Sequence, residues 1–173
     1  SDLKGDQPET FANIYLGRIR PIKVHVIGEV FAPGSYTLPG SATAFNALYL
    51  AGGPNSKGSF REIRVIRNGD VIKKMDVYEY LIDGNGDVNV TLRDDDVIMV
   101  PSYKNRVRME GEFKRTGIFE GKKGETVDDM IQYAGGFTDN AYSHRLEMFR
   151  NDSRQTKFNS IPSSRFEDEQ VQN

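Results

Sequence analysis

The side chains that could support catalysis are few and scattered in this sequence. The chain has 173 residues, two histidines and no cysteine. His25 and His144 do not fall at matching positions of the internal repeat described below, and no serine is spaced from a base and an orienting acid as nucleophilic catalysis requires. The lack of cysteine also excludes thiol nucleophiles, disulfides and thiolate metal sites. We therefore expect a protein that is not an enzyme and needs no cofactor.

One acidic loop has the residue types that bind calcium. Asp83, Asn85 and Asp87 follow the 1, 3, 5 spacing of an EF-hand loop, and Asp94 stands at position 12. Val88 occupies the position where that loop needs glycine, and no helix of suitable length is predicted after it. Aspartate, asparagine and glycine also suit turns without any metal. The sequence therefore predicts a solvated turn here and no metal site.

A group of basic residues gives a second candidate site. Lys114, Arg115, Lys122 and Lys123 fall at adjoining ends of a predicted hairpin and its exit loop, so that four cations could share one edge. Such an edge would attract a polymer with carboxylates or phosphates, weakly and in a salt-dependent way. A solubilising rim of exposed charge is the alternative interpretation. Basic and acidic residues are balanced in each half, 11 against 13 in 1–101 and 12 against 12 in 102–173, so the excess positive charge typical of nucleic-acid binding is absent from the sequence.

These residues belong to a sequence that repeats itself. A shift of 107 − 24 = 83 residues aligns 24–69 with 107–152 without a gap, and ten of the 46 positions are identical. The identical residues include Gly28 and Gly111 and the two Ala-Gly-Gly runs at 51–53 and 134–136. This period exceeds the roughly 20 to 50 residues of solenoid repeats, so it indicates that a small complete domain was duplicated.

Each copy has the same order of predicted elements. A strand with apolar residues at every second position, near 24–30 and 107–113, is followed by a tight turn and a returning strand. A short helix comes next, with apolar residues at i, i+3, i+4 and i+7 from Ala44 and from Val127, and it ends at the glycine pairs. A second hairpin follows in copy one, where Asn68-Gly69 is a strong turn signal.

Copy one adds a closing strand that copy two lacks. Residues 97–100 are apolar and are stopped by Pro101, and the resulting order of hairpin, helix, hairpin and closing strand is that of a β-grasp. We therefore predict an α+β chain of two tandem β-grasp domains, each a mixed sheet with one helix across it. Because no similar run occurs in the tail of copy two, either the sequence is cut there or another segment fills that edge of the sheet.

Four apolar side chains of copy one are predicted to form an interaction surface. Phe45 and Tyr49 lie at i and i+4 on the helix face opposite the buried stripe, where copy two has Asp128 and Gln132. Ile27 and Ile66 are apolar on the outer faces of their strands. These side chains indicate that copy one is covered by the other copy, by a neighbouring subunit or by the N-terminal connector.

Three motifs resemble those of a known family. The strings at 26–36, 51–54 and 95–101, together with the second copy, resemble the soluble-ligand-binding β-grasp (SLBB) tandem domains of bacterial outer-membrane polysaccharide export proteins. The resemblance covers 22 to about 158. Two departures from the family pattern are Asp95, where glycine is usual, and Lys114-Arg115-Thr116 in place of Phe31-Ala32-Pro33.

The resemblance implies a division of the chain and a role for it. We expect a connector at 1–20, a first domain at 21–102, a second, incomplete domain at 103–160 and a tail at 161–173. The implied role is non-catalytic binding and scaffolding in the periplasm, held at the outer membrane by other parts of the parent protein. The implied partners are an anionic polysaccharide, other export-machine subunits and further copies of the parent protein, with no nucleic acid. A receptor-like module that captures a small soluble ligand or sugar is the alternative.

Overall fold

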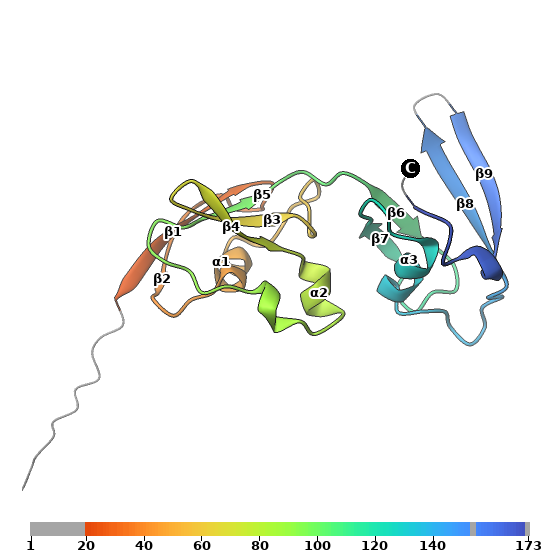
Figure 1. Ribbon diagram of the computed structural model, residues 1–173, viewed down its shortest axis with the longest axis horizontal. Helices are drawn as coiled ribbons and strands as arrows, with labels where there is room; N and C mark the ends of the chain where they lie inside the picture. The colour runs from red at the N-terminus through yellow and green to blue at the C-terminus, as the bar shows by residue number, and fades with distance from the viewer. Residues whose placement is uncertain (1–19, 153–154, 172–173) are drawn as a thin grey trace, which may run out of the picture.

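The computed structural model describes residues 20–152 and 155–171, which form two α+β domains joined end to end (Figure 1). The predicted connector at 1–20 lies almost entirely outside the described residues. The α+β class and the two tandem domains deduced from the sequence are confirmed. The mixed sheet predicted for each domain is present in the first, whereas the described residues of the second form two separate two-stranded sheets. No helix among the described residues is long and apolar enough to span a membrane.

The first domain is built on one five-stranded sheet in the order β2-β1-β5-β3-β4. Its strands are β1 (Pro21–Gly28), β2 (Gly34–Pro39), β3 (Ile63–Arg67), β4 (Asp70–Met75) and β5 (Val97–Val100). β5 pairs parallel with β1 and antiparallel with β3, so the last strand joins the two hairpins into one sheet. This is the β-grasp arrangement predicted for copy one.

Three short helices accompany this sheet. They are α1 (Ala44–Leu50), α2 (Val77–Leu81) and the 3-10 turn η1 (Gly86–Val88), and Figure 1 shows α1 and α2 below the same face of the sheet. α1 buries Ala44, Ala47 and Leu48, the stripe expected from its spacing. These side chains pack with Val26, Val65 and other buried residues of the strands into the first core.

Within the described residues, the second domain contains the same parts except for the joining strand. β6 (Arg106–Met109) pairs with β7 (Gly117–Glu120), and β8 (Arg145–Asp152) pairs with β9 (Gln155–Pro162), but the two hairpins remain separate two-stranded sheets. The helix α3 (Val127–Tyr133) lies beside them (Figure 1). Its capping box is formed by Thr126 and Asp129.

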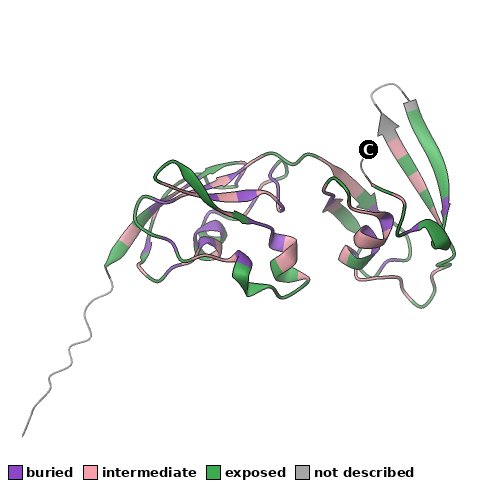
Figure 2. Cartoon of the chain, in the orientation of Figure 1, coloured by how far each residue is buried: buried purple, intermediate pink, exposed green. Residues whose placement is uncertain are grey.

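The segment assigned to a tail packs on the second domain. Residues 161–171 contain the 3-10 turn η2 (Ser163–Arg165), and Ile161 and Phe166 are buried in the second core. Gln170 forms an isolated bridge with Thr126, just as Thr91 bridges Thr43 in the first domain. The residue before each helix is therefore bridged in the same way in both halves. Buried residues occur in the interior of each half, with fewer along β8 and β9 (Figure 2).

Candidate functional site at the domain junction

A buried arginine connects the two domains. Arg61, just before β3, is only 5% exposed, and its Nε donates to both carboxylate oxygens of Asp76 at 2.9 and 2.8 Å. The other guanidinium nitrogens donate to Glu125 of the second domain at 3.1 and 2.7 Å. Arg61 also donates to the backbone oxygen of Glu120 at 3.0 Å. A further bond reaches the Tyr133 hydroxyl at 3.3 Å, so one side chain of the first domain donates to three residues of the second.

Two tyrosines, one from each domain, enclose this guanidinium. The Arg61 Cζ atom lies 4.5 Å from the ring centroid of Tyr78 and 4.9 Å from that of Tyr133, distances at which cation–π attraction is effective. The two rings contact each other edge to face at 5.2 Å between centroids. The Tyr133 hydroxyl donates to Glu125 at 2.8 Å. Arg61 is therefore held by charge, hydrogen bonds and aromatic faces together.

The pKa values at the junction follow from this packing. Burial alone would lower the pKa of Arg61, but the hydrogen bonds and charges of Glu125 and Asp76 outweigh burial and raise it, so Arg61 stays charged. Burial and the hydrogen bond to Glu125 raise the pKa of Tyr133 to about 12. Burial also raises the pKa of Tyr78. The junction is therefore stable with Arg61 cationic and both phenols protonated.

Glu120 forms a second link between the domains. Its side chain is buried and accepts from the Ser59 hydroxyl at 2.7 Å and from the Phe60 amide at 2.8 Å. Its own backbone N–H donates to the Tyr78 hydroxyl at 2.9 Å. Since buried polar groups are costly unless they are paired, these bonds fix the end of β7 against the first domain.

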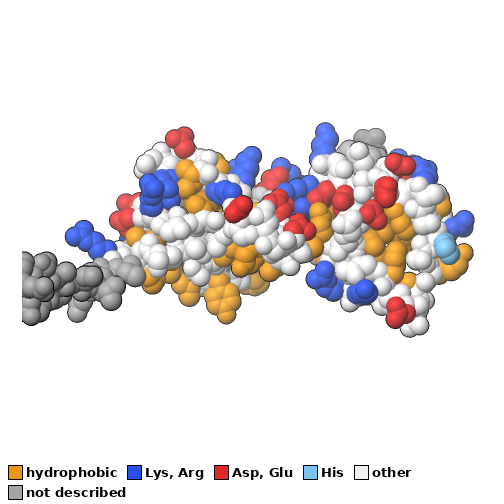
Figure 3. Space-filling model, turned by 60° about the horizontal axis from the view of Figure 1, so that its bottom comes forward, with side chains coloured by type: hydrophobic (Ala, Val, Ile, Leu, Met, Phe, Trp, Pro, Cys, Tyr) orange, Lys and Arg blue, Asp and Glu red, His pale blue; other side chains and the backbone are white. Residues whose placement is uncertain are grey.

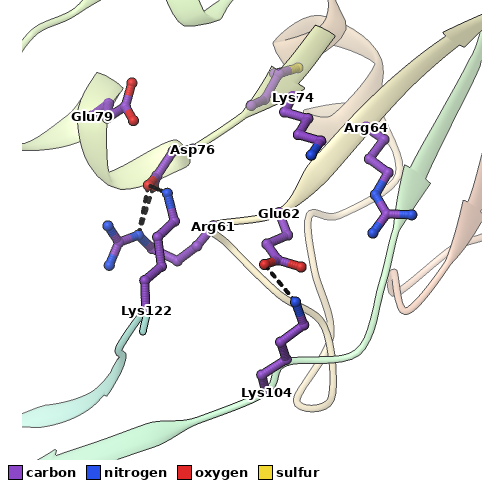
Figure 4. A pocket seen from close by; sticks show the side chains of 9 residues that line it. Arg61, Glu62, Arg64, Lys74, Asp76, Glu79, Lys104 and Lys122 are labelled. Atoms are coloured by element: carbon purple, nitrogen blue, oxygen red, sulfur yellow. Dashed lines mark hydrogen bonds and ion pairs between the residues drawn. The ribbon is translucent and has the colours of Figure 1, made fainter. Parts of the chain in front are cut away.

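A pocket of about 270 Å³ lies beside these contacts. Figure 4 shows that Arg64 of β3 and Lys74 of β4 extend toward the space next to Glu62 and Lys104. Lys104, in the segment between the domains, donates to Glu62 at 2.8 Å. The remaining side chains around the pocket are those of Arg61, Met75, Asp76, Glu79 and Lys122.

The basic residues predicted to share an edge fall into different settings. Lys122 is half-buried and pairs with Asp76, so it belongs to the junction. Lys123 is exposed next to it. Lys114 and Arg115 are exposed in the turn before β7, and the four residues of β7 separate them from Lys122 and Lys123. The structure thus brings Lys122 to the first domain and leaves the other three on the surface.

The four predicted apolar contact residues lie on two sides of the first sheet. Phe45 is half-buried against the first core and its ring lies 4.6 Å from that of Tyr80, whereas Tyr49 is 85% exposed. Ile27 and Ile66 follow Val26 and Val65, which face the core, so they lie on the opposite face of the sheet. Phe45 is therefore covered within its own domain, and no described part of the chain covers Tyr49.

The acidic loop with partial calcium-loop spacing, which was predicted to be a turn, is a hydrogen-bonded turn. Asn85 caps η1 by accepting from the Asp87 amide at 3.0 Å, and Asp94 accepts from the Lys23 amide at 2.7 Å. Across 20–152 and 155–171, no group of three or more histidine or acidic side chains is placed to hold a metal ion.

Arg61 was not predicted to be a functional residue. It is a single charged residue just before a strand, and in the aligned repeat its counterpart is His144. Because only ten of the 46 aligned positions are identical, this mismatch does not single out Arg61, and its role follows only from the contacts of the folded chain.

Comparison with known proteins identifies the family. The SLBB domain matches at 23–74 and again at 106–158. The chain belongs to the SLBB domain family. Two relatives, both described as polysialic acid transport protein KpsD from Escherichia coli, are 31% identical over 111 residues, which is 62% of this chain. The chain spans about a fifth of the length of these relatives, since the matched part is 20% of each.

Proposed function

We propose that this chain is a non-catalytic, periplasmic scaffold of a polysaccharide export protein that acts as one rigid block of two SLBB domains. The observation that supports this proposal best is the Arg61 junction, because its acceptors come from both domains and it is almost fully buried. Both SLBB relatives are named as polysialic acid transport proteins, which points to the export of a polysaccharide. A rigid pair would hold neighbouring modules of the parent protein at a fixed angle.

The exposed helix face of the first domain is proposed as the contact between copies of the parent protein. Tyr49 and Leu50 of α1 are 85% and 54% exposed, and Leu81 of α2 is 69% exposed. Figure 3 shows hydrophobic side chains gathered along one edge of the first domain. Monomeric proteins rarely leave such a patch uncovered. Ile27, which is 42% exposed, and Ile66 on the opposite sheet face are proposed as a second contact surface.

The test of this proposal is made in the parent protein, in a bacterium that exports a polysaccharide. We expect light scattering to show an oligomer, and envelope crosslinking to attach copies of the protein to one another. The double variant Tyr49→Ser/Leu81→Ser should reduce both the oligomer and the surface polysaccharide, with no loss of thermal stability. Tyr142→Ser, at a side chain that is 77% exposed in the second domain, is the matched control.

Two outcomes would contradict the proposal. A parent protein that stays monomeric while export continues would exclude assembly through these domains. Normal export by a folded Arg61→Lys variant, in which the arginine fork that reaches both domains is lost, would exclude the need for a rigid block.

The exposed cations Lys114, Arg115 and Lys123 are proposed to contact the exported polymer at the surface. This contact should weaken as salt is added, because exposed charges are screened. Changing all three residues to serine while export continues unaltered would speak against it.

A further inference from the structure

The junction pocket contains two cations that have no acidic partner in the described part of the chain. Arg64 and Lys74 occupy directly opposite positions in the β3–β4 ladder. The other cations around the pocket are paired: Lys104 with Glu62, Lys122 with Asp76, and Arg61 with Asp76 and Glu125. No described ion pair joins either Arg64 or Lys74 to a carboxylate, including that of Glu79.

This pairing of like charges works against folding. Cross-strand neighbours of the same charge destabilise a sheet, since their Cβ atoms lie only about 5 Å apart. The first domain nevertheless places an arginine opposite a lysine at the rim of its junction pocket. An anion bound between them would relieve the repulsion.

The charges near Glu62 indicate the sign of the local field. The hydrogen bond from Lys104 lowers the pKa of Glu62; burial opposes this effect, and the charges of Lys104, Arg64 and Lys122 add to it. Glu62 is thus one carboxylate among several cations, and it is already engaged by Lys104 at 2.8 Å. Five basic and three acidic side chains surround the pocket, an excess of two positive charges, 5 − 3.

We infer that the junction pocket binds the anionic group of an acidic sugar, with Arg64 and Lys74 as its direct partners. A guanidinium offers a carboxylate or phosphate two parallel hydrogen bonds, and the ammonium adds a mobile point charge. The volume of about 270 Å³ lies just below the roughly 300–1,000 Å³ of pockets for drug-sized ligands, which suits one sugar unit. Only the source of the sugar, an exported polysaccharide, rests on the proposed function.

The test is titration of the isotope-labelled 173-residue chain, followed by NMR shifts of its backbone amides. Glucuronate supplies a carboxylate, glucose 6-phosphate supplies a phosphate, and glucose is the neutral control. We expect millimolar, salt-sensitive binding of one or both anions at 62–64 and 74–76, and no binding of glucose. Shifts with glucuronate alone would identify a carboxylate site, and shifts with the phosphate alone would identify a phosphate site.

Variants separate this pocket from basic surface in general. Arg64→Gln and Lys74→Gln should each weaken binding about tenfold, the loss typical of one charge-assisted hydrogen bond. Each should leave the melting temperature unchanged or slightly higher, because a repulsive pair is removed. Lys74→Arg should retain binding. The double variant Lys57→Gln/Lys157→Gln is the matched control, because it removes two exposed cations outside the pocket, and it should bind like the parent chain.

Several results would overturn the inference. The first is that neither anion shifts the amides even at salt about 20-fold below physiological. The second is that glucose causes equal shifts. The third is that the anions still bind to Arg64→Gln and Lys74→Gln as they do to the parent chain. None of them would affect the proposed scaffold, which depends on assembly and export. Conversely, pocket binding by a parent protein that stays monomeric and is dispensable for export would overturn the scaffold alone.

Discussion

The two domains share one sequence pattern, and among the described residues only the first has the strand that joins its two hairpins. In the first, β5 lies between β1 and β3 and joins both hairpins. In the second, β6–β7 and β8–β9 stay separate. The consequence appears in the cores, since Ile63 and Val65 are fully buried whereas their counterparts Leu146 and Met148 are only partly buried. Within the described residues, the hairpin side chains of the first core are thus more deeply buried than those of the second. The reason is that β5 lies between the two hairpins of the first domain.

A second contrast concerns what each domain offers to its neighbour. The segment 59–61 of the first domain receives the second domain through Ser59, Phe60 and Arg61. The matching segment, 142–144, is exposed. The two copies therefore have similar folds, and the different residues that precede β3 and β8 make only the first copy a docking site for the other.

The largest effect is expected from loss of the junction. Arg61→Ala should lower the free energy of unfolding by about 3–5 kcal/mol, because it leaves Glu125 without its cationic partner and Asp76 with Lys122 alone. Chemical denaturation followed by circular dichroism measures the loss. The control is Arg108→Ala, at an exposed arginine that pairs with exposed Glu110 and should cost less than about 1 kcal/mol. Equal losses would show that the two domains are not coupled through Arg61.

The next test compares the two cores at one aligned position. Ile63→Ala should cost about 2–5 kcal/mol, as expected for a fully buried aliphatic side chain. Leu146→Ala should cost clearly less, because Leu146 is only partly buried. Hydrogen exchange of the amides in each domain reports the two stabilities separately. A greater loss from Leu146→Ala would reverse the order of core quality given above.

The third test uses two glycines that both have positive φ. A Cβ atom at Gly28 (φ +88°) would lie 2.1 Å from the Val100 oxygen of β5, whereas one at Gly111 (φ +99°) would meet no atom within 4 Å. Gly111→Ala should therefore cost only the roughly 1–2 kcal/mol of a left-handed backbone. Gly28→Ala should cost more, since β1 and β5 must also move apart. Thermal unfolding of both variants measures the difference, and equal costs would mean that β5 does not closely adjoin Gly28.

The sequence predicted the parts that depend on local pattern. Alternating apolar residues, the Asn68-Gly69 turn and the Thr126 cap act within a few residues, so the strands, hairpin and helix start were readable from the chain. Arg61 was missed because its partners Glu120 and Glu125 lie about 60 positions away, and nothing local marks them as partners. The Arg64–Lys74 pair was also missed, because the bulge between Val65 and Ile66 alters the register that sets which residues face each other.

The smallest effect concerns the ends of the equivalent helices. Tyr133, in the last turn of α3, takes part in the junction, whereas its counterpart Leu50 in α1 is 54% exposed. The pKa of Tyr133 is raised to about 12, and an ordinary tyrosine ionises near pH 10. Between these values the unfolded chain loses a proton that the folded chain keeps. The contribution of Tyr133 to the free energy of unfolding is therefore fully present below pH 10 and is lost as the pH rises toward 12.

Replacing the Tyr133 hydroxyl tests both its hydrogen bond at the junction and its raised pKa. Tyr133→Phe should cost about 1 kcal/mol near neutral pH, for the lost hydrogen bond to Glu125, while the ring stays near Arg61. The loss of stability between pH 10 and 12 should be smaller in this variant than in the parent chain, as measured by denaturation at each pH. Leu50→Ala is the control and should leave the slope over this range unchanged, since that position carries no ionisable group. Identical slopes for the parent chain and Tyr133→Phe would mean that the phenol at the junction titrates as it does in the unfolded chain, and that α3 contributes to the junction through its ring alone.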